Sequence, residues 1–146
     1  MSECISNLLI GTGKRLTSYK YYAAEYATTE PLVVGNTYTI SVYVEDVECD
    51  GATPRLAIYD GGSWANLGDL KSEPGTQTLT FTYQQPYPDH CDPNRICIYN
   101  TPPMTDKKRK TVFRHVMLVN GATPAAWAPA KNESLAADAG GGRRYD

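Results

Sequence analysis

The chain has 146 residues, 41% of them hydrophobic and 21% charged, a balance that predicts one folded domain with a core and excludes a wholly disordered chain. Its formal charge of −2 argues against nucleic acid as a partner, because backbone phosphates are bound by concentrated Lys and Arg. No apolar run approaches the roughly 20 residues that cross a bilayer, and the first residues lack the pattern of a signal peptide, so we expect no membrane partner and no secretion signal.

Alternating apolar and polar residues predict the strands. Residues 22–26 (YAAEY) are the first candidate, because a Tyr-rich run fits a strand better than a helix. Residues 36–48 (NTYTISVYVEDVE) give the clearest pattern, and residues 77–84 repeat it after a turn. The side chains that we expect to be buried are Tyr38, Ile40, Val42 and Val44 in the first of these strands and Leu79, Phe81 and Tyr83 in the second.

Three shorter runs have the same character and are bounded by Gly, Pro, Asn or Asp: residues 55–59, 95–99 and 111–119. The basic run 107–110 leads into the last of them and is expected to be a solvated turn. Many short strands separated by turn residues are typical of a sandwich or barrel, so the predicted fold class is all-β.

The sequence carries no recognisable catalytic motif. His90 and His115 have no nucleophile or paired carboxylate arranged around them, and His115 falls within a predicted strand, where a structural role is expected. Residues 11–14 (GTGK) lack the spacing of a phosphate loop and are predicted to be a turn. We therefore expect a protein that is not an enzyme and has no cofactor.

The cysteines give no metal site and no disulfide framework. Cys4, Cys49, Cys91 and Cys97 are scattered, and the five residues between Cys91 and Cys97 do not match the paired spacing of a structural zinc site. Reduced thiols and no bound metal are expected. Whether Cys91 and Cys97 pair is left open.

Aromatic residues supply the candidate binding site. The chain has 11 Tyr against two Phe and two Trp, and Tyr adds interface area while it keeps a polar group. Four aromatic residues fall in or beside predicted loops, where flat rings could stack on sugars or fill partner pockets: Tyr59, Trp64, Tyr87 and Tyr99.

Three short motifs resemble landmarks of the carbohydrate-binding-module-like jelly rolls found in bacteriophage tail and other virion proteins. The opening motif is Asn7-Leu8-Leu9, and the strand motif is residues 32–41 (LVVGNTYTIS). The closing motif is residues 117–124 (MLVNGATP) followed by Trp127-Ala128-Pro129. Trp127 is expected to pack down as an anchor. The resemblance spans about residues 7–132.

The resemblance implies a two-sheet antiparallel jelly-roll sandwich and a virion structural protein of the tail, fibre or capsid surface, made in the host cytoplasm. Such a protein would assemble with other virion proteins and as a homo-oligomer. Relatives that bind sugar often hold calcium through an acidic pair on the last strand, but Arg114-His115 stands there, so calcium is not carried over. A glycan-binding module for a host surface polysaccharide is the alternative.

The composition changes after Trp127 and predicts two regions, a sandwich domain over residues 1–132 and a flexible tail over residues 133–146. The tail is Gly-rich and cannot bury a core of its own. It ends in Arg143, Arg144 and Tyr145, residue types that anchor interfaces, so we expect it to contact a neighbouring chain in an assembly.

Overall fold

The computed structural model describes residues 5–49, 53–102 and 109–131. The strands are β1 (Leu16–Ser18), β2 (Tyr22–Ala27), β3 (Thr37–Cys49), β4 (Arg55–Asp60), β5 (Asn66–Lys71), β6 (Gly75–Thr82), β7 (Arg95–Thr101) and β8 (Arg109–Asn120). A 3-10 turn, η1 (Pro88–His90), precedes β7. The described residues contain no helix of the length and apolarity needed to cross a membrane.

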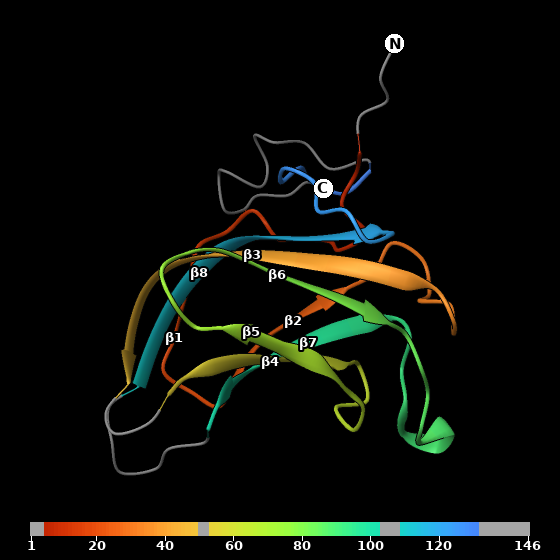
Figure 1. Cartoon of the computed structure of the whole chain (residues 1–146), viewed down its shortest axis with the longest axis horizontal. Helices are drawn as coiled ribbons and strands as arrows, with labels where there is room; N and C mark the ends of the chain where they lie inside the picture. The colour runs from red at the N-terminus through yellow and green to blue at the C-terminus, as the bar shows by residue number, and fades with distance from the viewer. Residues whose placement is uncertain (1–4, 50–52, 103–108, 132–146) are drawn as a thin grey trace.

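The strands form two four-stranded antiparallel sheets, with the orders β1-β8-β3-β6 and β2-β7-β4-β5. Figure 1 shows the first sheet as the upper layer and the second as the lower layer. The first strand pairs with the last, the second with the seventh, the third with the sixth and the fourth with the fifth. This is the order of a jelly roll, as if one long hairpin were rolled into a sandwich.

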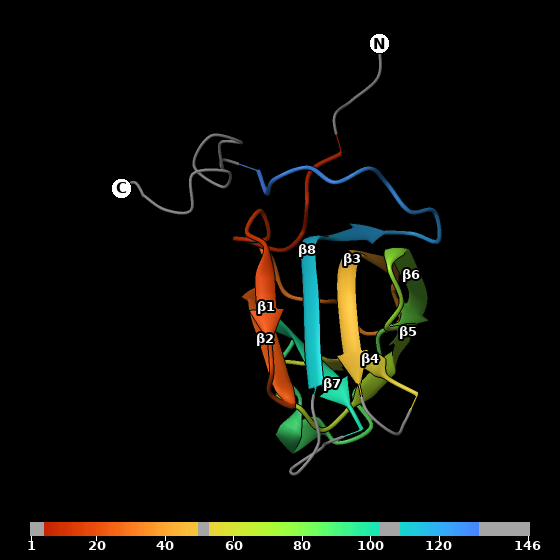
Figure 2. The same cartoon turned by 90° about the vertical axis from the view of Figure 1, so that its left-hand side faces the viewer.

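The two long strands β3 and β8 are strongly curved. Their register shifts twice, between Ser41 and Tyr43 and between Val44 and Asp46. Such β-bulges bend a strand and increase its twist. Both strands turn downward at the left of Figure 1, and Figure 2 looks onto the curved part.

Alternation along the strands builds the core between the sheets. The inward faces of β4 and β7 present Leu56, Ile58, Ile96 and Ile98, all with no exposed surface. The side chains predicted to be buried on β3 and β6 are in the core as expected, with Leu79 at its margin. Burial of each such side chain contributes about 1.5–3 kcal/mol.

Every strand expected from the sequence is present, but two were not predicted, β1 and β5. The polar face of β3 also differs from the expectation, because Thr39 and Ser41 are buried. The segment after β8 folds back over them, and the Thr39 hydroxyl donates to the Gly121 carbonyl at 2.8 Å.

Cys91 and Cys97 are not joined by a disulfide in this structure. The described ranges bring no three His, Cys, Asp or Glu side chains together in a way that could hold a metal ion. The predicted tail, with Arg143, Arg144 and Tyr145, lies outside the described residues and remains a prediction.

Candidate functional site

The four predicted aromatic residues lie along one surface of the β2-β7-β4-β5 sheet. Tyr99 alternates with the buried Ile98 on β7 and therefore points outward, opposite Tyr22 of β2 and Ala57 of β4. Its ring centroid lies 4.8 Å from that of Tyr21, 5.1 Å from that of Tyr22 and 5.1 Å from that of Tyr59. Tyr99 is the centre of a tyrosine cluster on the outer face of the sheet.

The other two predicted residues stand at the end of this face. Trp64 in the β4–β5 loop stacks on His90 with ring centroids 3.8 Å apart, and it meets Tyr87 edge-on at 5.6 Å. Trp64 is 55% exposed and Tyr87 is 47% exposed. The Tyr99 hydroxyl donates to Ser63 Oγ at 2.7 Å, which ties the loop to the cluster. We call these six residues the aromatic strip: Tyr21, Tyr22, Tyr59, Trp64, Tyr87 and Tyr99.

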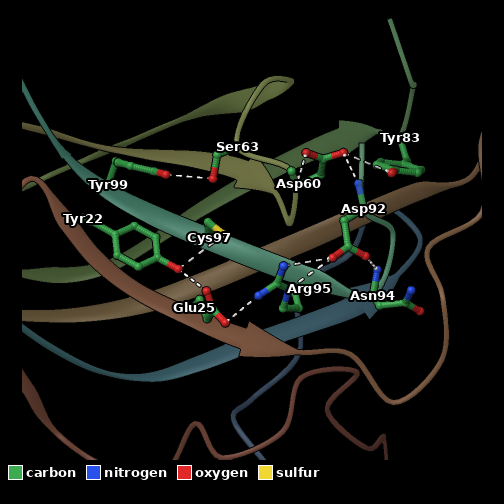
Figure 3. Close-up of polar contacts among 11 residues, drawn as sticks. Tyr22, Glu25, Asp60, Ser63, Tyr83, Asp92, Asn94, Arg95, Cys97 and Tyr99 are labelled. Carbon is green, nitrogen blue, oxygen red and sulfur yellow. Dashed lines mark hydrogen bonds and ion pairs between the residues drawn. The ribbon is translucent and has the colours of Figure 1, made fainter. Parts of the chain in front are cut away.

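A buried carboxylate fixes the loop that carries Trp64. Asp60 has no exposed surface, and its oxygens accept from the Gly62 N–H at 3.1 Å, the Asp92 N–H at 3.2 Å and the Tyr83 hydroxyl at 3.2 Å. Figure 3 shows these bonds joining the end of β4 to the segment before β7. Burial raises the pKa of Tyr83 to about 12, so its hydroxyl remains a donor.

Glycine allows the loop to approach this closely. A Cβ on Gly62 would lie 1.8 Å from the His90 carbonyl oxygen, and one on Gly61 would lie 2.9 Å from Asp92 Oδ2. The backbone of the loop therefore packs directly on the η1 segment. This contact presets the position of Trp64 against His90.

Two ion pairs lie near Tyr22, at one side of the strip, as Figure 3 shows. Arg95 Nη1 bonds Glu25 Oε2 at 2.8 Å, and its Nη2 lies 3.1 Å from Asp92 Oδ2. The Tyr22 hydroxyl and then Arg95 hold the pKa of Glu25 below its usual range. The Asn94 N–H and then Arg95 lower the pKa of Asp92. Both carboxylates are therefore charged at neutral pH.

Cys97 lies beneath the tyrosine cluster, 1% exposed, with its Sγ 3.8 Å from the Tyr22 hydroxyl. Burial raises the pKa of this thiol, which favours its protonated form, and the side chain packs as a small apolar group under the rings. Of the nearby carboxylates, Glu25 and Asp92 are held by Arg95, and Asp60 accepts three hydrogen bonds. The surface is suited to binding through flat rings and fixed polar groups.

The sequence indicated Tyr59, Trp64, Tyr87 and Tyr99 one by one, and the structure places all four in one strip. Tyr21 and Tyr22 of the strip, and His90 that stacks on Trp64, were not predicted as part of a site. The high Tyr content was the available signal for Tyr21 and Tyr22, but their neighbour Tyr99 is almost 80 residues away in the chain.

A second feature occupies the other sheet. Trp127 stacks on His115, with ring centroids 4.3 Å apart, and donates Nε1–H to Thr12 Oγ1 at 2.9 Å. The expected anchoring of Trp127 is confirmed, and His115 is held by stacking. A half-open cavity of about 260 Å³ lies beside them, lined by Tyr43, Arg114, His115 and Trp127 among others. Burial and then the charge of Arg114 lower the pKa of His115.

The opening and closing motifs meet at this point. The Asn7 side chain donates to Thr12 Oγ1 at 3.0 Å and to the Val116 carbonyl at 2.7 Å, and its Oδ1 accepts from the N–H of Leu9 at 3.0 Å and of Leu118 at 2.9 Å. We call Asn7, Thr12 and Trp127 the clasp. It ties residues 5–12 to residues 121–131, and the latter run above the upper layer in Figure 1. The strands that carry Tyr22, Tyr59 and Tyr99 belong to the other sheet, the lower layer.

Comparison with known proteins gives a structural neighbour. No protein-family model matches the chain, and a search of curated proteins finds no match. The fold is similar to the solved structure of the tripod (BppUct-A-L) from the baseplate of bacteriophage Tuc2009, with a TM-score of 0.51 and 12% identity. The likeness covers 92% of this chain and 62% of the neighbour, so the chain spans less than two thirds of that protein.

Proposed function

We propose that the chain is a structural component of a bacteriophage particle, at the tail, fibre or capsid surface, and that it acts by assembly with other virion proteins and not by catalysis. The observation that carries the proposal is the likeness of fold to a phage baseplate protein over 92% of the chain. The resemblance of the opening and closing motifs to those of virion jelly rolls supports it independently.

The layout of the molecule fits this role. The clasp holds both ends of the described chain on the β1-β8-β3-β6 side, because Asn7 N–H donates to the Pro129 carbonyl at 3.1 Å. The aromatic strip belongs to the opposite sheet. A domain held at its ends would thus present the strip to a partner. The Asp60 hydrogen bonds fix the loop that carries Trp64 before binding, which lowers the entropic cost of association.

Particle composition tests the proposal. Particles purified from lysates of cells that carry the gene should contain the chain, detected by mass spectrometry and located by antibody labelling in electron micrographs. We expect a fixed number of copies per particle. Mature particles that lack the chain, alongside abundant free protein in the lysate, would overturn the proposal.

A glycan-binding module is the second candidate. The observation that favours it is the exposure of flat rings near fixed polar groups, since Trp64 meets Tyr87 and stacks on His90, two residues before Asp92 of the Glu25–Arg95–Asp92 ion pairs. Such surfaces stack on the apolar faces of sugars. Calorimetry against capsule and lipopolysaccharide of the host tests it, with Trp64→Ala as the binding variant and Tyr19→Ala as the control for an exposed ring elsewhere. Equal heats from both variants would exclude the strip as a sugar site.

A further inference from the structure

The end of the aromatic strip carries more carboxylates than cations. Glu25 and Asp92 share the single guanidinium of Arg95. Asp89 of η1 is exposed, and within the described part of the chain no cation pairs with it. We call this surface the acidic corner: Glu25, Asp89 and Asp92 with the rings of Trp64 and Tyr87. The far end of the same sheet face instead carries Arg55 and Lys71, which lie opposite one another in the register of β4 and β5.

The chemistry of the acidic corner selects a guanidinium group. The Trp64 ring stacks on His90, and the residue is still 55% exposed. A planar cation can stack on an exposed indole or phenol ring and donate to a carboxylate at the same time, and arginine does both better than lysine. A partner with several acidic groups would be repelled by the surplus negative charge.

The chain itself supplies such a segment in Arg143-Arg144-Tyr145. The described chain ends at Lys131, just after Ala130 bridges Asn7 on the side of the β1-β8-β3-β6 sheet. The acidic corner belongs to the opposite sheet (Figure 1). A contact between the two surfaces of different copies would therefore be head-to-tail, the kind of interface that closes into a ring or extends as a fibre.

We propose that Arg143, Arg144 and Tyr145 of one copy dock on the acidic corner of a second copy. The inference rests on the proposed assembly function and names the surface and the segment that would perform it. The two guanidinium groups would meet the unpaired Asp89 carboxylate and the Glu25 and Asp92 carboxylates that share Arg95, and Tyr145 would add ring area beside Trp64. Because the attraction is between partly exposed charges, it should weaken as salt is raised.

Sedimentation velocity of the full chain over a range of concentrations tests the docking. We expect wild-type protein to self-associate, and we expect Arg143→Glu/Arg144→Glu and Trp64→Ala each to raise the dissociation constant by about tenfold or more. Arg55→Glu and Tyr19→Ala are the matched controls, one an exposed arginine at the far end of the sheet face and one a more exposed ring, and both should associate as wild type does. Thermal melts check that all variants are folded.

Mixing the two defective variants gives the sharper result. The Trp64→Ala chain keeps its tail and the Arg143→Glu/Arg144→Glu chain keeps its corner, so the mixture should form a one-to-one complex that neither variant forms alone. Wild-type protein that stays monomeric, or a charge-reversed tail that associates like wild type, would overturn the docking. A monomeric protein whose tail amide signals in NMR spectra shift on Trp64→Ala would also overturn it. The tail would then bind the acidic corner of its own chain.

The two proposals fail separately. A chain that self-associates as described but is absent from particles contradicts the proposed function alone. A chain that is present in particles and sediments as a monomer at every concentration contradicts the docking alone.

Discussion

Asp60 shows how one residue can set the position of a loop. Its buried carboxylate accepts hydrogen bonds from two backbone N–H groups and from Tyr83, with no cation beside it among the described residues. In Asp60→Asn the amide NH₂ would face one of these donors. We expect the variant to lose about 3 kcal/mol of unfolding free energy, because hydrogen bonds to a charged group contribute about 1.5–3 kcal/mol each.

Urea denaturation measures this loss, and Asp69→Asn is the matched control on the neighbouring strand. Asp69 is partly exposed and pairs with Arg55 at 3.3 Å, so its replacement should change stability by less than about 1 kcal/mol. Equal effects at the two positions would mean that Asp60 does not fix the loop.

The Glu25–Arg95–Asp92 group predicts a dependence on pH. Tyr22 and Arg95 lower the pKa of Glu25, and Asn94 and Arg95 lower that of Asp92. A carboxyl with a lowered folded pKa stabilises the fold fully above its unfolded value, about 4, and this stabilisation is lost as pH falls through the folded value. The stability difference between wild type and Arg95→Met should therefore be constant from pH 7 to about 5 and shrink below about pH 4. Urea denaturation at a series of pH values checks it, and a difference that persists to pH 2 would contradict it.

At the scale of elements, alternation predicted the strands that bury one apolar face. β5 escaped prediction because its sequence, NLGDLK, shows too little alternation, and Gly68 is required there by a close approach: a Cβ would lie 2.7 Å from Leu79 Cδ2. β1 has only three residues, too few for a pattern. The burial of Thr39 and Ser41 depends on a segment some 80 residues later, which periodicity within β3 cannot reveal.

The bulge in β8 predicts that a glycine variant is more stable than an alanine variant at one strand position. His115 and Val116 together face Val42, and His115 adopts φ 56, a left-handed conformation that favours glycine. His115→Gly and His115→Ala both lose the stack on Trp127, so their difference isolates the backbone. We expect Gly to be more stable than Ala by about 0.5–1 kcal/mol, against the usual strand preference.

Arg114, the preceding residue, supplies the control for this prediction. Its backbone is not among those with positive φ. Urea denaturation should therefore find Arg114→Ala more stable than Arg114→Gly. The same order at both positions would show that the left-handed conformation of His115 carries no strain.

At the scale of the molecule, the candidate site illustrates what one sequence can predict. Loop position and ring chemistry indicated Tyr59, Trp64, Tyr87 and Tyr99, because flat rings in or beside loops can stack on sugars or fill partner pockets. These residues form one strip only through contacts between segments that are distant in the sequence, such as those of Trp64 with His90 and of Tyr99 with Ser63. The Asp60 hydrogen bonds have no sequence signature at all, since an Asp after a strand is ordinary.

The clasp gives the prediction that concerns the whole fold. β1 pairs with β8 over Thr111, Val112 and Phe113, and farther along β8 the backbone groups of Val116 and Leu118 are bonded by Asn7 and Leu8. Asn7→Ala would leave the Val116 carbonyl and the Leu9 and Leu118 N–H groups without these partners. An unpaired buried group costs about 1–3 kcal/mol. We therefore expect a loss of about 4 kcal/mol, against less than about 0.5 kcal/mol for Asn66→Ala on the exposed edge of β5.

Fluorescence decides whether the clasp belongs to the same cooperative unit as the sandwich. In a Trp64→Phe background, Trp127 is the remaining tryptophan and reports the segment after β8 alone. Because Asn7 bonds β8 next to the core residues Val116 and Leu118, opening the clasp exposes a central strand. The Trp127 transition in urea should then coincide with the circular-dichroism transition of the sheets in both wild-type and Asn7→Ala backgrounds. A Trp127 transition at lower urea, with the sheets unchanged, would show that the clasp opens as a separate local unit.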